Sequence, residues 1–279
     1  MDINEILEEI FTKDIDKIIS KQELIGIRLS GGIDSAFMCY LTMQKYPHIK
    51  LLPITMYNKL KPAAQKSVAR VLNTLKILNP NSNLLDNTET AFFDTSGFVK
   101  TEKMIEDFEK YGIKYNPKDV FQRKWFYSLW PKYPNMNMYF SGETLNPPIE
   151  EQPKIITGEN RKFPKDRNVK REKLYSITKN KHYGSFKYEF RPFRNKNKKE
   201  IAKWVKDLGL FNTLFKVSET CETEIEMYGE YAKPDFFNLT YKEPGVEACM
   251  RCWPCREKYW AYGYYDFMKK ETDDRYKII

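Results

Sequence analysis

Residues 30–35, Ser-Gly-Gly-Ile-Asp-Ser, constrain the fold of this chain more than any other segment. They follow a short apolar run, 24–29, that is typical of a buried parallel strand, and they precede a segment, 36–46, with apolar residues at helical spacing. Gly31 and Gly32 therefore fall at a strand-to-helix turn, where glycine permits backbone angles that are closed to other residues. Several N–H groups then converge on an anion at the positive end of the helix, so the sequence predicts a phosphate-binding loop.

The polar side chains of this loop fit a bound nucleotide. Ser30 and Ser35 supply hydroxyl donors, and Asp34 supplies a carboxylate suited to holding Mg²⁺ against the phosphates. A glycine turn with an Asp or Ser helix cap is the alternative, but a cap needs fewer such residues than this loop contains. The nucleotide-binding residues expected here are Ser30, Gly31, Gly32, Ile33, Asp34 and Ser35.

Strand and helix patterns alternate along most of the chain, which predicts a doubly wound α/β fold with a parallel sheet and helices on both of its faces. Ligands of such sheets bind beyond the carboxyl ends of the strands. Thr55 and Met56 close the second strand and are therefore expected to border the adenosine. The expected elements are helices over 3–20, 62–78, 99–112 and 117–130 and strands over 24–29, 51–56, 136–143 and 188–193.

Length and composition favour a globular cytoplasmic protein. The 279 residues are 41% hydrophobic, which is enough for a packed core. No apolar stretch approaches the roughly 20 residues that span a bilayer, and the first residues are too acidic for a signal peptide. We expect a nucleotide-binding domain over 1–210 and a smaller C-terminal subdomain over 211–279. Aromatic residues over 121–130 and 260–267 leave a homodimer interface open.

A basic segment lies within an expected insertion over 144–187. Residues 161–181 hold nine Lys or Arg against two acidic residues and show no regular periodicity. The pattern favours a solvated surface loop. Contact with nucleic acid and a lid over the nucleotide site are the alternatives, because either would place the positive charge on phosphates.

Four of the five cysteines lie in the C-terminal subdomain. Cys249, Cys252 and Cys255 follow a Cys-x₂-Cys-x₂-Cys spacing that lets three thiolates converge, and Cys221 would complete a tetrahedron. A closed four-thiolate site predicts structural Zn²⁺, with an iron–sulfur cluster as the alternative. Cys39, on the helix after the loop, is expected to be a buried packing residue.

The hexapeptide matches the Ser-Gly-Gly-x-Asp-Ser signature of the PP-loop ATP pyrophosphatases at every specified position, and the chain resembles that superfamily. The resemblance implies an adenine nucleotide alpha hydrolase-like fold and cleavage of ATP between its α- and β-phosphates. A lysine that enters a helix near the phosphates in these proteins matches Lys198. A glycine at a strand end beside the nucleotide or substrate matches Gly142, which precedes Glu143.

The cysteines add a resemblance to the 7-cyano-7-deazaguanine synthases, QueC-like ligases that convert 7-carboxy-7-deazaguanine to the nitrile with ATP and ammonia. Two departures leave the acceptor open. There are 27 residues between Cys221 and Cys249, many more than in that family, and residues 144–148 lack the acidic pattern expected beside a deazaguanine pocket.

The resemblance thus implies adenylation of an acceptor carboxylate or carbonyl, release of pyrophosphate and amination by ammonia from a separate source. Asp34, Ser35 and Lys198 are the catalytic residues that it implies, and Arg191 and Arg194 are further candidates for phosphate contacts. Two alternatives stand beside this interpretation. One is sulfur insertion into tRNA by a PP-loop thiolase, and the other is a non-catalytic subunit that binds ATP to control a partner.

Overall fold

The computed structural model describes residues 1–58, 63–93, 117–155, 165–179, 186–219 and 253–264, together with Glu102, Ile105, Glu106 and Glu109. Within this described part, no helix has the length and apolar character that crossing a membrane requires. The helix expected over 99–112 falls mostly outside it.

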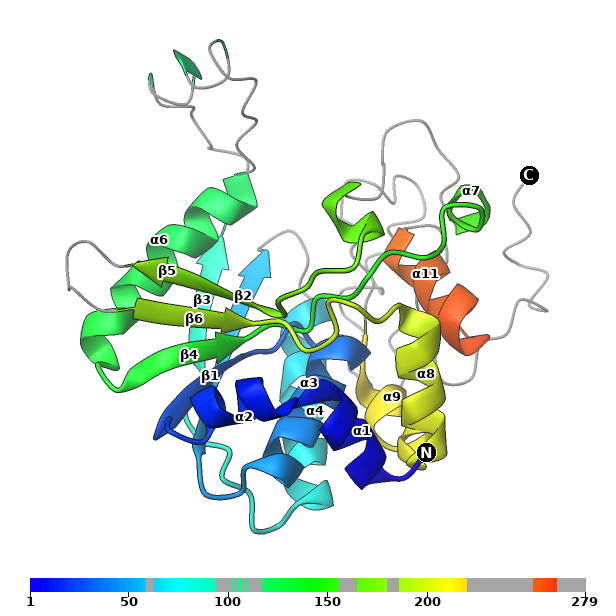
Figure 1. Ribbon diagram of the computed structural model, residues 1–279, viewed down its shortest axis with the longest axis horizontal. Coiled ribbons are helices and arrows are strands. Elements are labelled where there is room, and N and C mark those ends of the chain that lie inside the picture. Colours follow the sequence, from blue (N-terminus) through cyan, green and yellow to red (C-terminus); the bar gives the residue numbers. More distant parts are fainter. Residues whose placement is uncertain are drawn as a thin grey trace, which may run out of the picture.

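Six described strands form one sheet in the order β3-β2-β1-β4-β6-β5. Every neighbouring pair is parallel except β5 and β6, which are antiparallel at one edge. The five parallel strands and the helices packed against them confirm the expected α/β class (Figure 1). The strands are β1 (Leu24–Arg28), β2 (Lys50–Asn58), β3 (Glu89–Phe93), β4 (Met136–Phe140), β5 (Tyr175–Lys179) and β6 (Phe186–Phe190).

The described helices lie before β1, in the connections between strands and after β6. In chain order they are α1 (Ile3–Ile10), α2 (Lys13–Ile19), α3 (Ile33–Lys45), α4 (Ala63–Leu78), α6 (Pro117–Lys132), α7 (Gln152–Ile155), α8 (Lys198–Asp207), α9 (Leu214–Val217) and α11 (Trp253–Tyr262), with short 3₁₀ turns at Lys165–Asn168 and Leu210–Asn212.

Different helices cover the two faces of the sheet. On one face, Ile25 and Ile27 of β1 belong to the main core, which α1, α3, α4 and α8 complete. On the other face, Leu52 and Ile54 of β2 form a smaller cluster with Phe126 of α6. The alternation of side chains along each strand produces this division, so both faces are buried as the sequence pattern predicts.

The helix expected over 3–20 is instead two helices. α1 ends at Ile10, Phe11 leaves the helical conformation, and α2 begins at Lys13. The break allows the Phe11 ring to enter the core, where it contacts the rings of Tyr46 and Phe190. Burying one large aromatic ring compensates for the interrupted helix, and periodicity alone does not reveal such a break.

Several strands also differ from expectation. β4 ends at Phe140, short of the strand expected over 136–143, β6 spans Phe186–Phe190 rather than 188–193, and β3 was not expected. β2 runs to Asn58, two residues beyond the strand expected over 51–56, because its last residues pair with β3. The basic segment, expected to be irregular, contains β5, which pairs with β6 from Tyr175 to Lys179. The alternating pattern of these five residues is too short to stand out among the flanking lysines and arginines.

Candidate functional site

The loop over 30–35 lies where the strand order of the sheet reverses. From β1 the chain moves to β2 on one side, whereas β4 pairs with β1 on the other side. The connections that follow β1 and β4 therefore leave in opposite directions. Ligands of doubly wound sheets bind beyond the carboxyl ends of the strands at such a point, so the topology places the predicted phosphate loop where a ligand site is expected.

The backbone of this loop depends on glycine at Gly31. Its φ of 82° lies in the left-handed region, which residues with a side chain rarely adopt. Gly32 is the N-cap residue of α3, so the first N–H groups of that helix open towards the loop. The two serines tie the turn together, since the Ser30 N–H donates to Ser35 Oγ at 3.2 Å and Ser35 Oγ donates to the Gly32 carbonyl at 3.0 Å.

The Gly31 carbonyl is held from outside the loop. Ser67 Oγ of α4 donates to it at 2.8 Å, and the Glu219 N–H donates to it at 2.9 Å. In a trans peptide the following N–H points away from the carbonyl, so these bonds turn the Gly32 N–H to the opposite side. Two donors from distant parts of the chain thus fix how the loop presents its backbone.

Gly142 follows β4 and touches the first turn of α3. A Cβ atom at this position would lie 2.9 Å from both Cα and N of Ser35 and 3.1 Å from the carbonyl carbon of Asp34. Real Cβ atoms do not approach backbone so closely, which gives this glycine a packing role between the two loops. Direct contact of Gly142 with a nucleotide stays a prediction.

Lys198 and Asp34 come together although they are far apart in sequence. Lys198 is the first residue of α8, and an Asn197–Glu200 capping box fixes the start of that helix. The Lys198 ammonium lies 3.3 Å from Asp34 Oδ2 and 2.8 Å from Glu257 Oε2, a residue of α11. The lysine and both carboxylates are buried or nearly so, and Glu257 is fully buried.

The carboxylates of Asp34 and Glu257 determine the protonation state of Lys198. Burial by itself lowers the pKa of Lys198, but Asp34 and Glu257 outweigh that effect and raise the pKa above its ordinary value. The ammonium therefore stays charged. The other carboxylate oxygen of Asp34, Oδ1, is buried without a hydrogen-bond partner. A buried oxygen of this kind fits a cation such as Mg²⁺.

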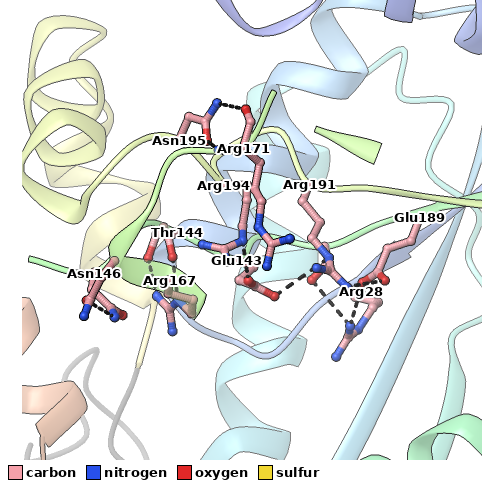
Figure 2. A network of polar contacts seen from close by, with 12 residues as sticks. Arg28, Glu143, Thr144, Asn146, Arg167, Arg171, Glu189, Arg191, Arg194 and Asn195 are labelled. Atoms are coloured by element: carbon pink, nitrogen blue, oxygen red, sulfur yellow. Dashed lines mark hydrogen bonds and ion pairs between the residues drawn. The ribbon is translucent and has the colours of Figure 1, made fainter. Parts of the chain in front are cut away.

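Beside the loop, arginines and glutamates alternate along the carboxyl ends of β1, β4 and β6 (Figure 2). Glu189 accepts from Arg191 at 2.6 Å and lies 3.5 Å from Arg28, and Glu143 lies 2.9 Å from Arg194 Nε. Arg191 and Arg194, which the sequence marks as candidates for phosphate contacts, are thus engaged with carboxylates.

Thr55 and Met56 lie within β2 as expected, but they do not close it, since β2 continues to Asn58. Because Arg28, the last residue of β1, pairs with Ile54, the part of β2 from Thr55 onwards extends past the end of β1. Thr55 is buried and Met56 is half-buried. Their contact with adenosine stays a prediction.

The predicted metal site lies largely outside the described residues, since Cys221, Cys249 and Cys252 fall there. Cys255 is buried on α11, two residues before Glu257. Within the described ranges no group of three or more His, Cys, Asp or Glu is placed to hold a metal ion. Cys39 is buried in the core as expected, and burial raises the pKa of its thiol to about 12.

Sequence reasoning missed several residues that hold the loop. They are Ser67, Glu219, Glu257 and Lys258. The adjacent pair Glu257 and Lys258 has the pattern of a solvated helix face, yet both residues are buried. Only the tertiary packing of α11 against α8 turns them inward, so no local signal marks them.

Comparison with solved structures gives distant likenesses. The U34-tRNA thiolase NcsA from Methanococcus maripaludis, solved with its [4Fe-4S] cluster, is 16% identical with a TM-score of 0.43, over 94% of this chain and 78% of that one. The NH3-dependent NAD synthetase from Campylobacter jejuni is 17% identical with a TM-score of 0.37, over 93% and 96%. The FMN adenylyltransferase from Candida glabrata is 12% identical with a TM-score of 0.33, over 71% and 54%.

With TM-scores below 0.5, these three likenesses carry no argument about what this chain binds or does. No protein-family model matches the sequence, and no curated protein matches it either.

Proposed function

We propose that the chain is an ATP-using enzyme of the PP-loop ATP pyrophosphatase superfamily that adenylates an acceptor and then aminates it. One observation carries the proposal: Asp34, in the Ser-Gly-Gly-Ile-Asp-Ser turn at the N-terminus of α3, meets the Lys198 ammonium of α8. The positive end of a helix, a buried ammonium and a carboxylate with a buried oxygen lacking a partner suit a polyphosphate with its cation.

In this proposal the β- and γ-phosphates bind to the N–H groups of residues 31–35 and to the hydroxyls of Ser30 and Ser35. The Lys198 ammonium stabilises the negative charge that builds on the departing pyrophosphate. Asp34 would hold Mg²⁺, which, when bound, neutralises further charge on the phosphates. Thr55, Met56 and Gly142 would border the rest of the nucleotide.

The chemistry follows from this arrangement. An oxygen of the acceptor carboxylate or carbonyl attacks the α-phosphorus of ATP, and the bond from that phosphorus to the oxygen bridging the α- and β-phosphates breaks. The electron pair leaves with pyrophosphate, and the acceptor becomes an AMP ester. Ammonia then attacks the activated carbon, AMP leaves, and the nitrogen gives up a proton to yield the amide.

The acceptor that we propose is 7-carboxy-7-deazaguanine or a related small molecule, aminated to the amide and, after a second activation, to the nitrile. This part rests on the sequence resemblance and on the cysteine spacing. Cys221, Cys249, Cys252 and Cys255 would hold Zn²⁺ as a structural staple of the C-terminal subdomain.

The test incubates the purified chain with ATP, Mg²⁺, ammonium and 7-carboxy-7-deazaguanine, and follows the acceptor by mass spectrometry together with pyrophosphate release. The expected result is amide or nitrile, with AMP and pyrophosphate in equal amounts. If tRNA gains sulfur instead, in the presence of a sulfide source, the enzyme is a thiolase. If ATP binds but no tested acceptor releases pyrophosphate, the chain is a regulatory subunit and the proposal is wrong.

A further inference from the structure

Glu257 is a buried acid for which the sequence offers no role. It lies on α11, 0% of its surface is exposed, and Oε2 is 2.8 Å from the Lys198 ammonium. Its second oxygen, Oε1, is buried without a hydrogen-bond partner. A buried carboxylate is costly, so its retention opposite a site lysine calls for a specific explanation.

Lys198 lies closer to the Glu257 carboxylate than to the Asp34 carboxylate. The contact from Lys198 to Glu257 is 0.5 Å shorter than the 3.3 Å contact to Asp34. Glu257 is also the more deeply buried of the two acids. The ammonium is therefore held at the shorter distance from α11, and Asp34 is the more distant of its two partners.

The two contacts of Lys198 become important when a polyphosphate and its cation bind. Asp34 has two competing tasks, since it faces Lys198 and would also hold the cation of the nucleotide. If Lys198 relied on Asp34 alone, the two would close into a neutral pair, and that pair would compete with the cation for Asp34 and with phosphate for Lys198. Glu257, a second carboxylate on α11, gives the ammonium another partner, so the lysine stays held when Asp34 binds the cation.

We propose that Glu257 is a positioning residue that holds the Lys198 ammonium in place and leaves Asp34 available to the cation. The proposal rests on the proposed function, because it concerns the same phosphate site. It extends the site to α11, which packs against α8 (Figure 1).

The neighbouring residue on α11 supports the same picture. Lys258 is also buried, and its ammonium donates to the Ser218 carbonyl at 3.0 Å and lies over the Phe215 ring. Ser218 precedes Glu219, whose N–H donates to the Gly31 carbonyl. Consecutive charged residues of α11 thus reach both ends of the phosphate loop, one through Lys198 and Asp34 and the other through the segment at 218–219.

The chain offers a matched control for this idea. Glu151 also joins α8 to α11, since its carboxylate contacts Lys199 at 2.9 Å and accepts from the Trp260 indole. It is partly exposed, and Lys199 and Trp260 lie outside the phosphate loop. Glu151→Gln therefore removes a glutamate charge between the same two helices without acting on Asp34.

The experiment measures equilibrium binding of the non-hydrolysable analogue AMPCPP over a range of Mg²⁺ concentrations, by calorimetry, for the wild type and for Glu257→Gln, Glu257→Asp and Glu151→Gln. Glutamine has nearly the shape of glutamate, and unfolding in urea reports whether each variant is folded. We expect Glu257→Gln to weaken AMPCPP binding by about 10-fold or more and to raise the Mg²⁺ concentration needed for half-maximal binding. Glu257→Asp should recover part of the loss, and Glu151→Gln should bind like the wild type.

The outcomes separate this inference from the proposed function. If the wild type binds no AMPCPP at any Mg²⁺ concentration, the proposed function is wrong and the inference falls with it. If the wild type binds and folded Glu257→Gln binds equally well with the same Mg²⁺ dependence, Glu257 does not position Lys198. A loss that Glu151→Gln shares would assign the effect to helix packing, and would also overturn the inference.

Discussion

Replacing Gly142 by alanine tests whether close approach of two loops shapes the phosphate site. The new methyl carbon would lie 2.9 Å from the Ser35 backbone, whereas an ordinary contact begins at 3.4 Å. The loop after β4 and the first turn of α3 must therefore separate by roughly 0.5 Å, which is the tolerance within which binding groups keep their geometry. Backbone atoms are the obstacle, so rotation of a side chain cannot relieve the clash.

Such overpacking costs about 1–3 kcal/mol of unfolding free energy. Displacing the first N–H groups of α3 removes at least one charge-assisted hydrogen bond to a phosphate, which corresponds to ATP binding weaker by about 10-fold. Urea unfolding gives the first quantity, and calorimetric titration with AMPCPP and Mg²⁺ gives the second. Gly142→Ala should lower both the unfolding free energy and the affinity for AMPCPP.

Two other glycines provide controls. At Gly26 a methyl carbon would meet Ile54 Cδ1 at 2.5 Å and Met136 Sδ at 2.8 Å, but these are the ends of flexible side chains on the α6 face. At Gly209, with φ of 69°, nothing lies within 4 Å, so alanine costs only the strain of the left-handed backbone, about 1–2 kcal/mol. Both variants should lose stability and keep wild-type ATP affinity. If Gly142→Ala also keeps wild-type affinity and stability, the close approach does not position the loop.

Three further variants have defined outcomes. Lys198→Met leaves the buried Glu257 carboxylate and the largely buried Asp34 carboxylate without the ammonium that they share. It should cost about 3–5 kcal/mol in urea unfolding and abolish ATP binding, and a cost below about 1 kcal/mol would contradict the buried ion group. The folded-state pKa of Lys198 is raised above its ordinary value of 10.5. The ion group therefore stabilises the fold fully below pH 10.5, and this stabilisation is lost as the pH rises through the folded-state pKa. The difference in unfolding free energy between wild type and Lys198→Met should accordingly shrink above pH 10.5. Ser67→Ala removes a donor to the Gly31 carbonyl and should lower stability by about 0.5–1.5 kcal/mol and weaken AMPCPP binding, whereas an unchanged affinity would show that the Glu219 N–H suffices. Cys39→Ala should leave ATP affinity and product formation unchanged, because burial keeps this thiol protonated; loss of product with intact folding would reveal a chemical role.

The local parts of the site were predictable because short stretches of sequence encode them. A branched apolar strand, two glycines and a helical pattern define the loop at 30–35, and the Asn197–Glu200 capping box marks where Lys198 enters α8. The α/β fold with a parallel sheet was predictable from the alternation of strand and helix patterns. Each of these signals spans a few residues and depends on backbone geometry.

The remaining parts depend on contacts between distant segments. The pairing of Gly31 with Ser67 and Glu219, and of Lys198 with Glu257, joins residues that no spacing rule connects. The break at Phe11 depends on a ring that is more favourable in the core than in a continuous helix. The site of four cysteines stays a prediction, since Cys255 is the only one of the four that lies in the described part of the chain.

In the proposed mechanism, the loop at 30–35 grips the pyrophosphate end of ATP while the α-phosphorus is attacked. This mechanism is tested most directly by identifying which phosphate bond breaks, with ATP labelled separately at the α- and γ-phosphates and products separated by chromatography after incubation with acceptor, ammonium and Mg²⁺. We predict that the α-label appears in AMP and the γ-label in pyrophosphate, and that Asp34→Asn forms neither product. Labelled ADP together with free phosphate would contradict the account.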